Sequence, residues 1–176
     1  MEEHVNQKVD ILIPVYKEPI DIIERMFMAC YRQNTDCLDL KVWLCIDGAD
    51  KDEEKIINAL ATKYNINLST RPNRNGFRAG ALNYCIQNNV GPDIKYIIVL
   101  DVDQAPKPNM VTELVKEMEK EENKETHFIM FPQVAENTEK NAITKASDIL
   151  QRYDYYFNRR IRSLSNSAFV VGTNWI

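Results

Sequence analysis

The stretch YIIVLDVDQAP, residues 96–106, is apolar from Tyr96 to Leu100 and then carries two carboxylates, Asp101 and Asp103. A short apolar run bounded by polar residues is typical of a strand buried on both faces, as in a parallel sheet. Residues two apart on an extended segment face the same way, so we expect the two carboxylates to lie together just past the strand. Two like charges at short range repel each other unless a cation lies between them. The pair therefore predicts a site for Mg²⁺ or Mn²⁺, which prefer oxygen ligands and often bind phosphate oxygens too.

The same acid pair has a simpler explanation. Aspartate is common where a strand turns towards a helix, because its side chain caps backbone N–H groups. Pro106 and Pro108 follow closely, as they would in such a turn. On this interpretation each aspartate only shapes the chain.

Outward from this stretch, the chain alternates short β-type runs with longer helical patterns. Apolar residues recur at helical spacing between the β-type runs, and several of these runs are apolar throughout. The alternation predicts an α/β fold in a single domain, with a mostly parallel sheet flanked by helices. The expected strands are 9–15, 40–46, 66–70, 95–100, 127–131 and 168–172, and the expected helices are 20–33, 52–64, 77–88, 108–121 and 138–164.

Composition narrows the possible partners and compartments. The 176 residues are about the length of one domain and carry a formal net charge of −4, so we expect no nucleic-acid partner. The four cysteines lack CxxC spacing and lie far from the two histidines, which argues against a zinc site and favours reduced thiols in the cytoplasm. We find no signal peptide and no apolar run of about 18 residues. We therefore expect a soluble chain, which could be a piece of a longer protein.

Polar residues follow three of the expected strands, in PVYKEP (14–19), IDGAD (46–50) and DVDQ (101–104). In open α/β sheets, ligands bind beyond the carboxyl ends of the strands near the switch in strand order, so we expect these residues to converge on one rim. There Tyr16 could stack on a nucleobase and Asp47 could accept a hydrogen bond from its N–H. A buried tyrosine and a turn aspartate before Gly48 are the structural alternatives.

The stretch RPNRNGFRAGALN, residues 71–83, supplies the opposite charge. Gly76 and Gly80 allow a tight turn and a close helix start, while Arg74 and Arg78 lie near a helix N-terminus whose dipole favours an anion. A diphosphate could be held there, although the stretch lacks both the GK[ST] of a P-loop and the GxGxxG dinucleotide fingerprint. The alternative is a surface loop with solvated arginines.

Taken together, the motifs resemble those of family 2 glycosyltransferases, and most closely the processive cellulose-synthase-like branch. The resemblance covers residues 9–174. It implies a Rossmann-like GT-A fold, a nucleotide-sugar donor, a Mg²⁺ or Mn²⁺ ion under the diphosphate, a glycan acceptor, and membrane segments in a parent protein whose catalytic domain is cytosolic. It favours a UDP-sugar, with UDP-glucose first. The motifs are ILIPVYKEP, CIDGAD, NGFRAGALN, VLDVDQAPKPN, FPQ and FVVGTN.

The resemblance also implies roles for individual residues. Lys17 stands where the family's P-x-Y-N-E donor loop usually has asparagine, and Ile46 replaces the first acid of its D-D-G motif. Arg78 takes the basic position of the K-A-G-x-L-N motif. The residues implied to bind the donor nucleotide are Pro14, Tyr16, Glu18, Asp47, Arg78 and Asp101. Asp103, with Asp101, is implied to bind the metal, and Pro132, Gln133, Gly172, Thr173 and Asn174 to line the donor sugar or the acceptor.

The family's general base lies in a T-E-D motif after the G-T-N stretch, and a Q-x-x-R-W motif follows it. Neither motif occurs in residues 1–176. The resemblance therefore implies that residues 1–176 are the N-terminal, donor-binding part of an inverting glycosyltransferase, whose base lies beyond Ile176. General base catalysis typically contributes about 10²–10⁴-fold, so we expect nucleotide binding with weak or absent sugar transfer.

Two other classes of protein stay open. IIVLDVDQA is similar to the hhhhDxDx strand of haloacid-dehalogenase-type phosphatases, whose first aspartate is a phosphoryl nucleophile. That strand usually comes first in such enzymes, whereas it is the fourth expected strand here. The chain could also be a non-catalytic binding or assembly module that keeps the motifs for folding alone.

The segment ILQRYDYYFNRRIRSL, residues 149–164, mixes apolar and aromatic residues with four arginines. Ile149, Tyr153 and Tyr156 recur on one helical face, so we expect this face to pack on the sheet while the arginines are solvated. The alternative is that the arginines meet lipid headgroups or a membrane segment.

Overall fold

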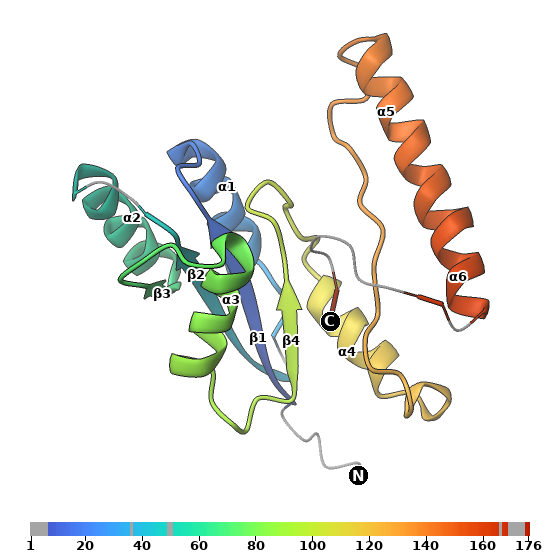
Figure 1. Cartoon of the computed structure of the whole chain (residues 1–176), viewed down its shortest axis with the longest axis horizontal. Coiled ribbons are helices and arrows are strands. Elements are labelled where there is room, and N and C mark those ends of the chain that lie inside the picture. The colour runs from blue at the N-terminus through green and yellow to red at the C-terminus, as the bar shows by residue number, and fades with distance from the viewer. Residues whose placement is uncertain (1–6, 36, 49–50, 166, 169–174) are drawn as a thin grey trace.

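The computed structural model describes residues 7–35, 37–48, 51–165, 167–168 and 175–176. Its centre is a four-stranded sheet in which all neighbouring strands are parallel, in the order β3-β2-β1-β4 (Figure 1). The strands are β1 (Gln7–Val15), β2 (Leu38–Ile46), β3 (Asn67–Thr70) and β4 (Tyr96–Val99). The chain steps outward from β1 through β2 to β3 and then returns to add β4 on the other side of β1. The strand order therefore switches between β1 and β4.

Helices cover both faces of the sheet, which confirms the predicted α/β architecture. The alternating side chains of Val9, Ile11 and Ile13 join one core with α1, α2 and α4. Leu12, on the opposite face of β1, packs with Cys85 of α3. Because both faces are covered, β1 is apolar at every position from Ile11 to Val15. The helices are α1 (Ile20–Tyr31), α2 (Lys51–Tyr64), α3 (Phe77–Asn88), α4 (Met110–Met118) and α5 (Ala142–Tyr153).

The expected strand at 127–131 is wrong. Met130 instead forms a single antiparallel bridge with Trp175, which also bridges Val99 of β4. The neighbouring Ile129 and Ile176 exchange two backbone hydrogen bonds of 3.0 Å. The expected strand at 168–172 lies almost entirely outside the described residues. The described part of the chain therefore has four strands and this short bridged edge, where six strands were expected.

The last helical segment begins at Ala142, later than the predicted start at residue 138, and it does not lie on the sheet as expected. Asn141 caps α5, since its side chain accepts from the backbone N–H of Thr144 and the Thr144 hydroxyl accepts from the backbone N–H of Asn141. The segment continues through a π-helical turn (Asp154–Arg159) into α6 (Arg160–Leu164). It lies beside the extended segment that precedes it and apart from the sheet (Figure 1).

The expectation that this helix packs its apolar face on the sheet is therefore wrong. Ile149, Tyr153 and Tyr156 are each more than half exposed. Other helices take the positions against the sheet: α1, α2 and α4 pack on one face and α3 packs on the other. Within the described residues, no helix is both long enough and apolar enough to cross a membrane.

Candidate functional site

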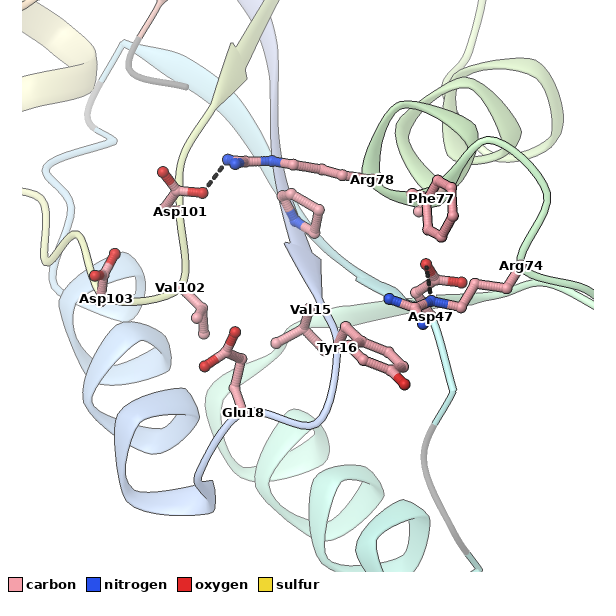
Figure 2. A pocket seen from close by; sticks show the side chains of 12 residues that line it. Val15, Tyr16, Glu18, Asp47, Arg74, Phe77, Arg78, Asp101, Val102 and Asp103 are labelled. Carbon is pink, nitrogen blue, oxygen red and sulfur yellow. Dashed lines mark hydrogen bonds and ion pairs between the residues drawn. The ribbon is translucent and has the colours of Figure 1, made fainter. Parts of the chain in front are cut away.

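A pocket of about 340 Å³ opens at the carboxyl ends of β1, β2 and β4, at the switch in strand order. This is where ligands bind in open α/β sheets, and the volume is within the range of small-molecule sites. Figure 2 shows two separate ends, one with Tyr16, Asp47 and Arg74, the other with Asp101 and Asp103. The lining residues are Pro14, Val15, Tyr16, Glu18, Asp47, Arg74, Phe77, Arg78, Ala81, Asp101, Val102 and Asp103.

At the end of the pocket that contains Tyr16, two arginines hold Asp47 in place. It follows β2 directly and is only 5% exposed. The guanidinium of Arg71, equally buried, donates to Asp47 Oδ1 from Nε at 2.9 Å and from Nη2 at 2.6 Å. Arg74 Nε donates to the other oxygen, Oδ2, at 3.3 Å. The carboxylate is therefore held by two cations, and its Oδ2 carries the longer and weaker of these bonds.

An aromatic surface adjoins this carboxylate. The guanidinium carbon of Arg74 lies 3.3 Å from the centre of the Tyr16 ring and 5.4 Å from the centre of the Phe77 ring. Figure 2 shows all three side chains at the same end of the pocket as Asp47. Flat aromatic and guanidinium faces are the surfaces on which nucleobases stack. This end can therefore offer a base both a stacking face and a hydrogen-bond acceptor.

Arg71 and Gly80 fix the start of α3 against the strand ends. Arg71 donates to the backbone oxygens of Asn75, at 2.5 Å, and Phe77, at 2.8 Å. A Cβ on Gly80 would lie 1.9 Å from the Asn75 oxygen and 2.4 Å from Arg71 Nη1, so only glycine permits this contact. The N-cap residue Gly76 has φ 74° and offers no side-chain cap. The first turn of α3 is therefore suited to an anion, with Arg78 on it.

The second end is acidic. Asp101 and Asp103 lie in a turn after β4, where an extended segment was expected, and the intervening Val102 is buried. Arg78 reaches across the pocket to pair with the Asp101 carboxylate (Figure 2). The side-chain oxygen of Gln104 also accepts from the Asp101 backbone N–H at 3.0 Å. Asp103 is exposed at the same end of the pocket.

This acidic end fits a hard divalent cation that shares its coordination with a ligand. Mg²⁺ commonly takes one or two carboxylates and completes its shell with phosphate oxygens and water. Among the described residues, no three histidine, cysteine, aspartate or glutamate side chains converge to hold a metal ion by themselves. The protein would therefore supply Asp101 and Asp103, and the remaining ligands would come from a bound diphosphate and solvent.

The structure brings together most of the predicted site residues. Those that line the pocket are Pro14, Tyr16, Glu18, Asp47, Arg78, Asp101 and Asp103. Pro132 and Gln133 do not line it, and the Gln133 side-chain oxygen instead accepts from Gln151 Nε2 at 2.9 Å. Gly172, Thr173 and Asn174 lie outside the described residues.

Arg71 and Phe77 were missed as functional residues. Arg71 stands directly after β3, and no local pattern indicates that it reaches back to the end of β2. The available signal was indirect: an aspartate at the end of a buried strand needs a cation, and RPNR is the first basic run that follows it. From the sequence, Phe77 was interpreted only as the first apolar residue of a helix. In the structure its ring is exposed beside Arg74.

Comparison with solved structures confirms the fold. The mannosyltransferase PcManGT from Pyrobaculum calidifontis, in complex with GDP-Man and Mn²⁺, superposes with TM-score 0.53 at 20% identity, covering 66% of this chain and 33% of that one. TarS from S. aureus superposes with TM-score 0.56 at 14% identity, covering 73% of this chain and 22% of that one. At these identities the likeness shows the architecture, which is the GT-A fold of glycosyltransferases.

Sequence comparison gives the family. Two Arabidopsis thaliana proteins, "Probable glucomannan 4-beta-mannosyltransferase 15" and "10", are 29% and 28% identical to this chain over 104 residues. The match covers 56% of this chain and 19% of each relative. The sequence model of the family described as "Glycosyl transferase family 2" matches residues 10–176. The chain belongs to glycosyl transferase family 2 and, within it, has the features of a cellulose-synthase-like domain.

Proposed function

We propose that residues 1–176 form the donor-binding part of a glycosyltransferase domain whose donor is a nucleotide sugar. The observation that carries the proposal is the division of one pocket into a stacking end and an acidic end, with Arg78 and the start of α3 between them. A nucleoside diphosphate has the matching order of groups, with a flat base at one end and charged phosphates at the other.

Each part of the donor has a proposed partner. The base stacks at Tyr16 and donates an N–H to Asp47, whose Oδ2 has the weaker of the existing bonds. The ribose lies against Asp101, and the diphosphate meets Arg78 and the backbone N–H groups of the first turn of α3. Arg78 must then exchange its bond to Asp101 for one to phosphate. A divalent cation at Asp103 and Asp101 would supply charge neutralisation for the departing diphosphate.

The proposed reaction is an inverting displacement, in which an acceptor hydroxyl attacks the anomeric carbon and the nucleoside diphosphate leaves. The role of these residues is to hold the donor and to stabilise negative charge on the leaving group, through Arg78 and the helix start. No T-E-D motif occurs in residues 1–176. We therefore expect the chain by itself to bind donor better than it transfers sugar.

The identity of the donor is a choice between two bases and two sugars. The motifs favour UDP-glucose, whereas the two plant relatives are named as mannosyltransferases and PcManGT was solved with GDP-Man. Asp47 can accept from N3–H of uracil or from N1–H and the amino group of guanine. The names of the relatives support mannose, so we place GDP-mannose ahead of UDP-glucose.

The phosphatase alternative has lost its support. The family 2 match covers residues 10–176, including the DxD stretch. In addition, Arg78 and Gln104 hold the Asp101 carboxylate that would have to act as the nucleophile. The binding or assembly module remains as the outcome in which no nucleotide binds.

Calorimetric titration tests the proposal directly. GDP, UDP and ADP would be titrated into the chain with Mn²⁺ present and again with EDTA. We expect GDP to bind most tightly with Mn²⁺ and ADP to bind poorly, because adenine has no N–H at position 1 to donate to Asp47. Tighter binding of UDP than GDP would reverse the order of donors. The proposal is contradicted if none of the three nucleotides binds under either condition.

A further inference from the structure

Arg74 occupies the place in the pocket that the proposed function gives to the nucleobase. Its guanidinium carbon lies 3.3 Å from the centre of the Tyr16 ring. Flat groups in van der Waals contact lie about 3.5 Å apart, so no base can enter between the guanidinium and this face of the ring. Arg74 therefore covers the surface on which a base would stack.

The same side chain also takes the hydrogen-bond acceptor. Arg74 Nε donates to Asp47 Oδ2 at 3.3 Å, and Figure 2 marks this contact. A guanidinium is flat and carries its N–H donors in its plane, as the N–H edges of uracil and guanine do. Arg74 thus makes both of the contacts that the proposed function assigns to the base, which are stacking on Tyr16 and donation to Asp47.

The hold of Arg74 on Asp47 is weaker than that of its neighbour Arg71. The Arg74 side chain is 43% exposed and donates one bond of 3.3 Å, which is longer than the usual range of about 2.7–3.2 Å. The Arg71 side chain is 5% exposed, donates to Asp47 at 2.6 and 2.9 Å, and also donates to two backbone oxygens. Displacement of Arg74 therefore leaves the Asp47 carboxylate paired and the loop anchored.

Phe77 offers Arg74 a second position. The Phe77 ring is 68% exposed, and its centre lies 5.4 Å from the guanidinium carbon of Arg74. Arginine stacks on the face of a phenylalanine ring as it does on tyrosine. The guanidinium thus has an aromatic partner next to the place that it leaves. Its positive charge stays beside the pocket, which favours a bound diphosphate.

We propose that Arg74 is a placeholder for the nucleobase: it stacks on Tyr16 and pairs with Asp47 Oδ2 until the base of the donor displaces it. This inference rests on the proposed function, because it concerns the same pocket. When only a fraction of a protein is in the state that binds, its affinity for the ligand is reduced by that fraction. The placeholder therefore lowers the affinity for every nucleotide that displaces it by one common factor, whichever base the nucleotide carries.

Calorimetric titration of Arg74→Ala with GDP, UDP and inorganic pyrophosphate, each with Mn²⁺, tests the proposal. Pyrophosphate carries no base, so its affinity measures the effect of the lost charge alone. Relative to pyrophosphate, we expect GDP and UDP to bind Arg74→Ala more tightly by the same factor of about three to ten. Such a factor means that the base position of the unchanged chain is open about a third to a tenth of the time. Arg74→Ser should give the same result.

The control is Arg32→Ala, which removes an exposed arginine at the end of α1, outside the pocket. It should bind all three ligands as the unchanged chain does, and circular dichroism should show that all variants are folded. Arg71→Met is expected to act in the opposite direction from Arg74→Ala and to weaken nucleotide binding. The two arginines touch the same carboxylate, but only Arg71 anchors the loop to the backbone.

The outcomes separate this inference from the proposed function. If GDP and UDP bind the unchanged chain and Arg74→Ala does not bind them more tightly relative to pyrophosphate, the placeholder is overturned. A loss of nucleotide affinity in Arg74→Ala with pyrophosphate binding unchanged would also overturn it, and would show that the base stacks on the guanidinium. Both of these outcomes leave the proposed function intact. If neither the unchanged chain nor Arg74→Ala binds a nucleotide, the inference and the proposed function fail together.

Discussion

Asp47 and Arg71 form a pair that ties β2 to the loop before α3, and both side chains are about 95% buried. Removing one partner of a buried pair typically costs about 3–5 kcal/mol. Without Arg71, Asp47 would keep only its longer bond from Arg74, so we expect a cost near the lower end of that range. Arg71→Met is therefore expected to lower the free energy of unfolding by about that amount, as measured by urea denaturation. It should also weaken nucleotide binding, because the loop that carries Arg74 loses its anchor.

Lys55→Met is the matched control for this prediction. Lys55 pairs with Asp52 at 3.0 Å on the exposed surface of α2, where such pairs contribute about 0–1 kcal/mol. A loss of stability in Arg71→Met no larger than in Lys55→Met would show that the buried pair does not hold the loop.

At the residue scale, the sequence predicted those site residues that directly follow strands. It did not predict the site residues whose side chains reach the pocket from the loop and helix after β3. Asp101, Asp103, Tyr16 and Asp47 could be found because the carboxyl ends of parallel strands meet at one edge. Arg71 and Phe77 could not, because their roles depend on how α3 approaches the sheet. Asp103 and Asp101 also occupy a turn, so their relation follows from the turn and not from strand periodicity.

Among the elements, β1 contains a buried carboxylate, Asp10. Asp10 is 1% exposed in the middle of the strand, and only its Oδ2 has a partner, Trp43 Nε1 at 2.8 Å. Burial raises the pKa of this carboxyl above its ordinary value, and the Trp43 hydrogen bond opposes that shift. The folded protein therefore holds the Asp10 proton more tightly than the unfolded chain does.

The pH dependence follows from this difference. Below the pKa of the unfolded chain, about 3.9, Asp10 is protonated in both states and folding carries no ionisation penalty. As the pH rises through that value towards the raised pKa of the folded state, stability is lost, by about 1.4 kcal/mol for each pH unit of separation. Asp10→Asn cannot ionise, and its side-chain oxygen can still accept from Trp43.

Urea midpoints measured between about pH 2.5 and pH 8 check this prediction. Relative to the unchanged chain, Asp10→Asn should gain stability as the pH rises through the unfolded pKa. The two pH profiles should run parallel below about pH 3, where Asp10 is protonated in both states. A stability difference that is constant across the range would show that Asp10 does not titrate differently in the two states.

Element by element, the sequence predicted where helices and strands lie more reliably than what they contact. The strands β1, β2 and β4 could be predicted from their apolar runs, whereas β3 is short and is exposed at Asn67 and Thr70. The apolar run at 127–131 looks the same in sequence, but only Met130 forms a bridge there. Periodicity likewise placed Ile149, Tyr153 and Tyr156 on one helical face without revealing that this face is exposed and lies away from the sheet. Spacing aligns apolar side chains, whereas tertiary structure decides what they contact.

For the whole molecule, alternation of strands and helices was enough to predict a parallel sheet covered on both sides. The strand order β3-β2-β1-β4 then places the ends of β1 and β4 beside the switch, where the pocket is found. The sequence could not supply the volume of the pocket or its division into two ends. Those properties depend on where Arg71 and Gly80 hold the start of α3, because Arg74, Phe77 and Arg78 line the pocket from there.

The most direct test of the account is the dependence of nucleotide binding on Mn²⁺ in the unchanged chain and in Asp103→Ala. The nucleoside diphosphate that binds best would be titrated with Mn²⁺ and with EDTA, and Asp52→Ala, on the exposed surface of α2, would serve as the control. We expect Mn²⁺ to tighten binding at least about tenfold in the unchanged chain and in Asp52→Ala, because metal and diphosphate share ligands. In Asp103→Ala the affinity should be the same with Mn²⁺ or EDTA. Full enhancement by Mn²⁺ in Asp103→Ala would contradict the assignment of the acidic end as the site of the metal and diphosphate.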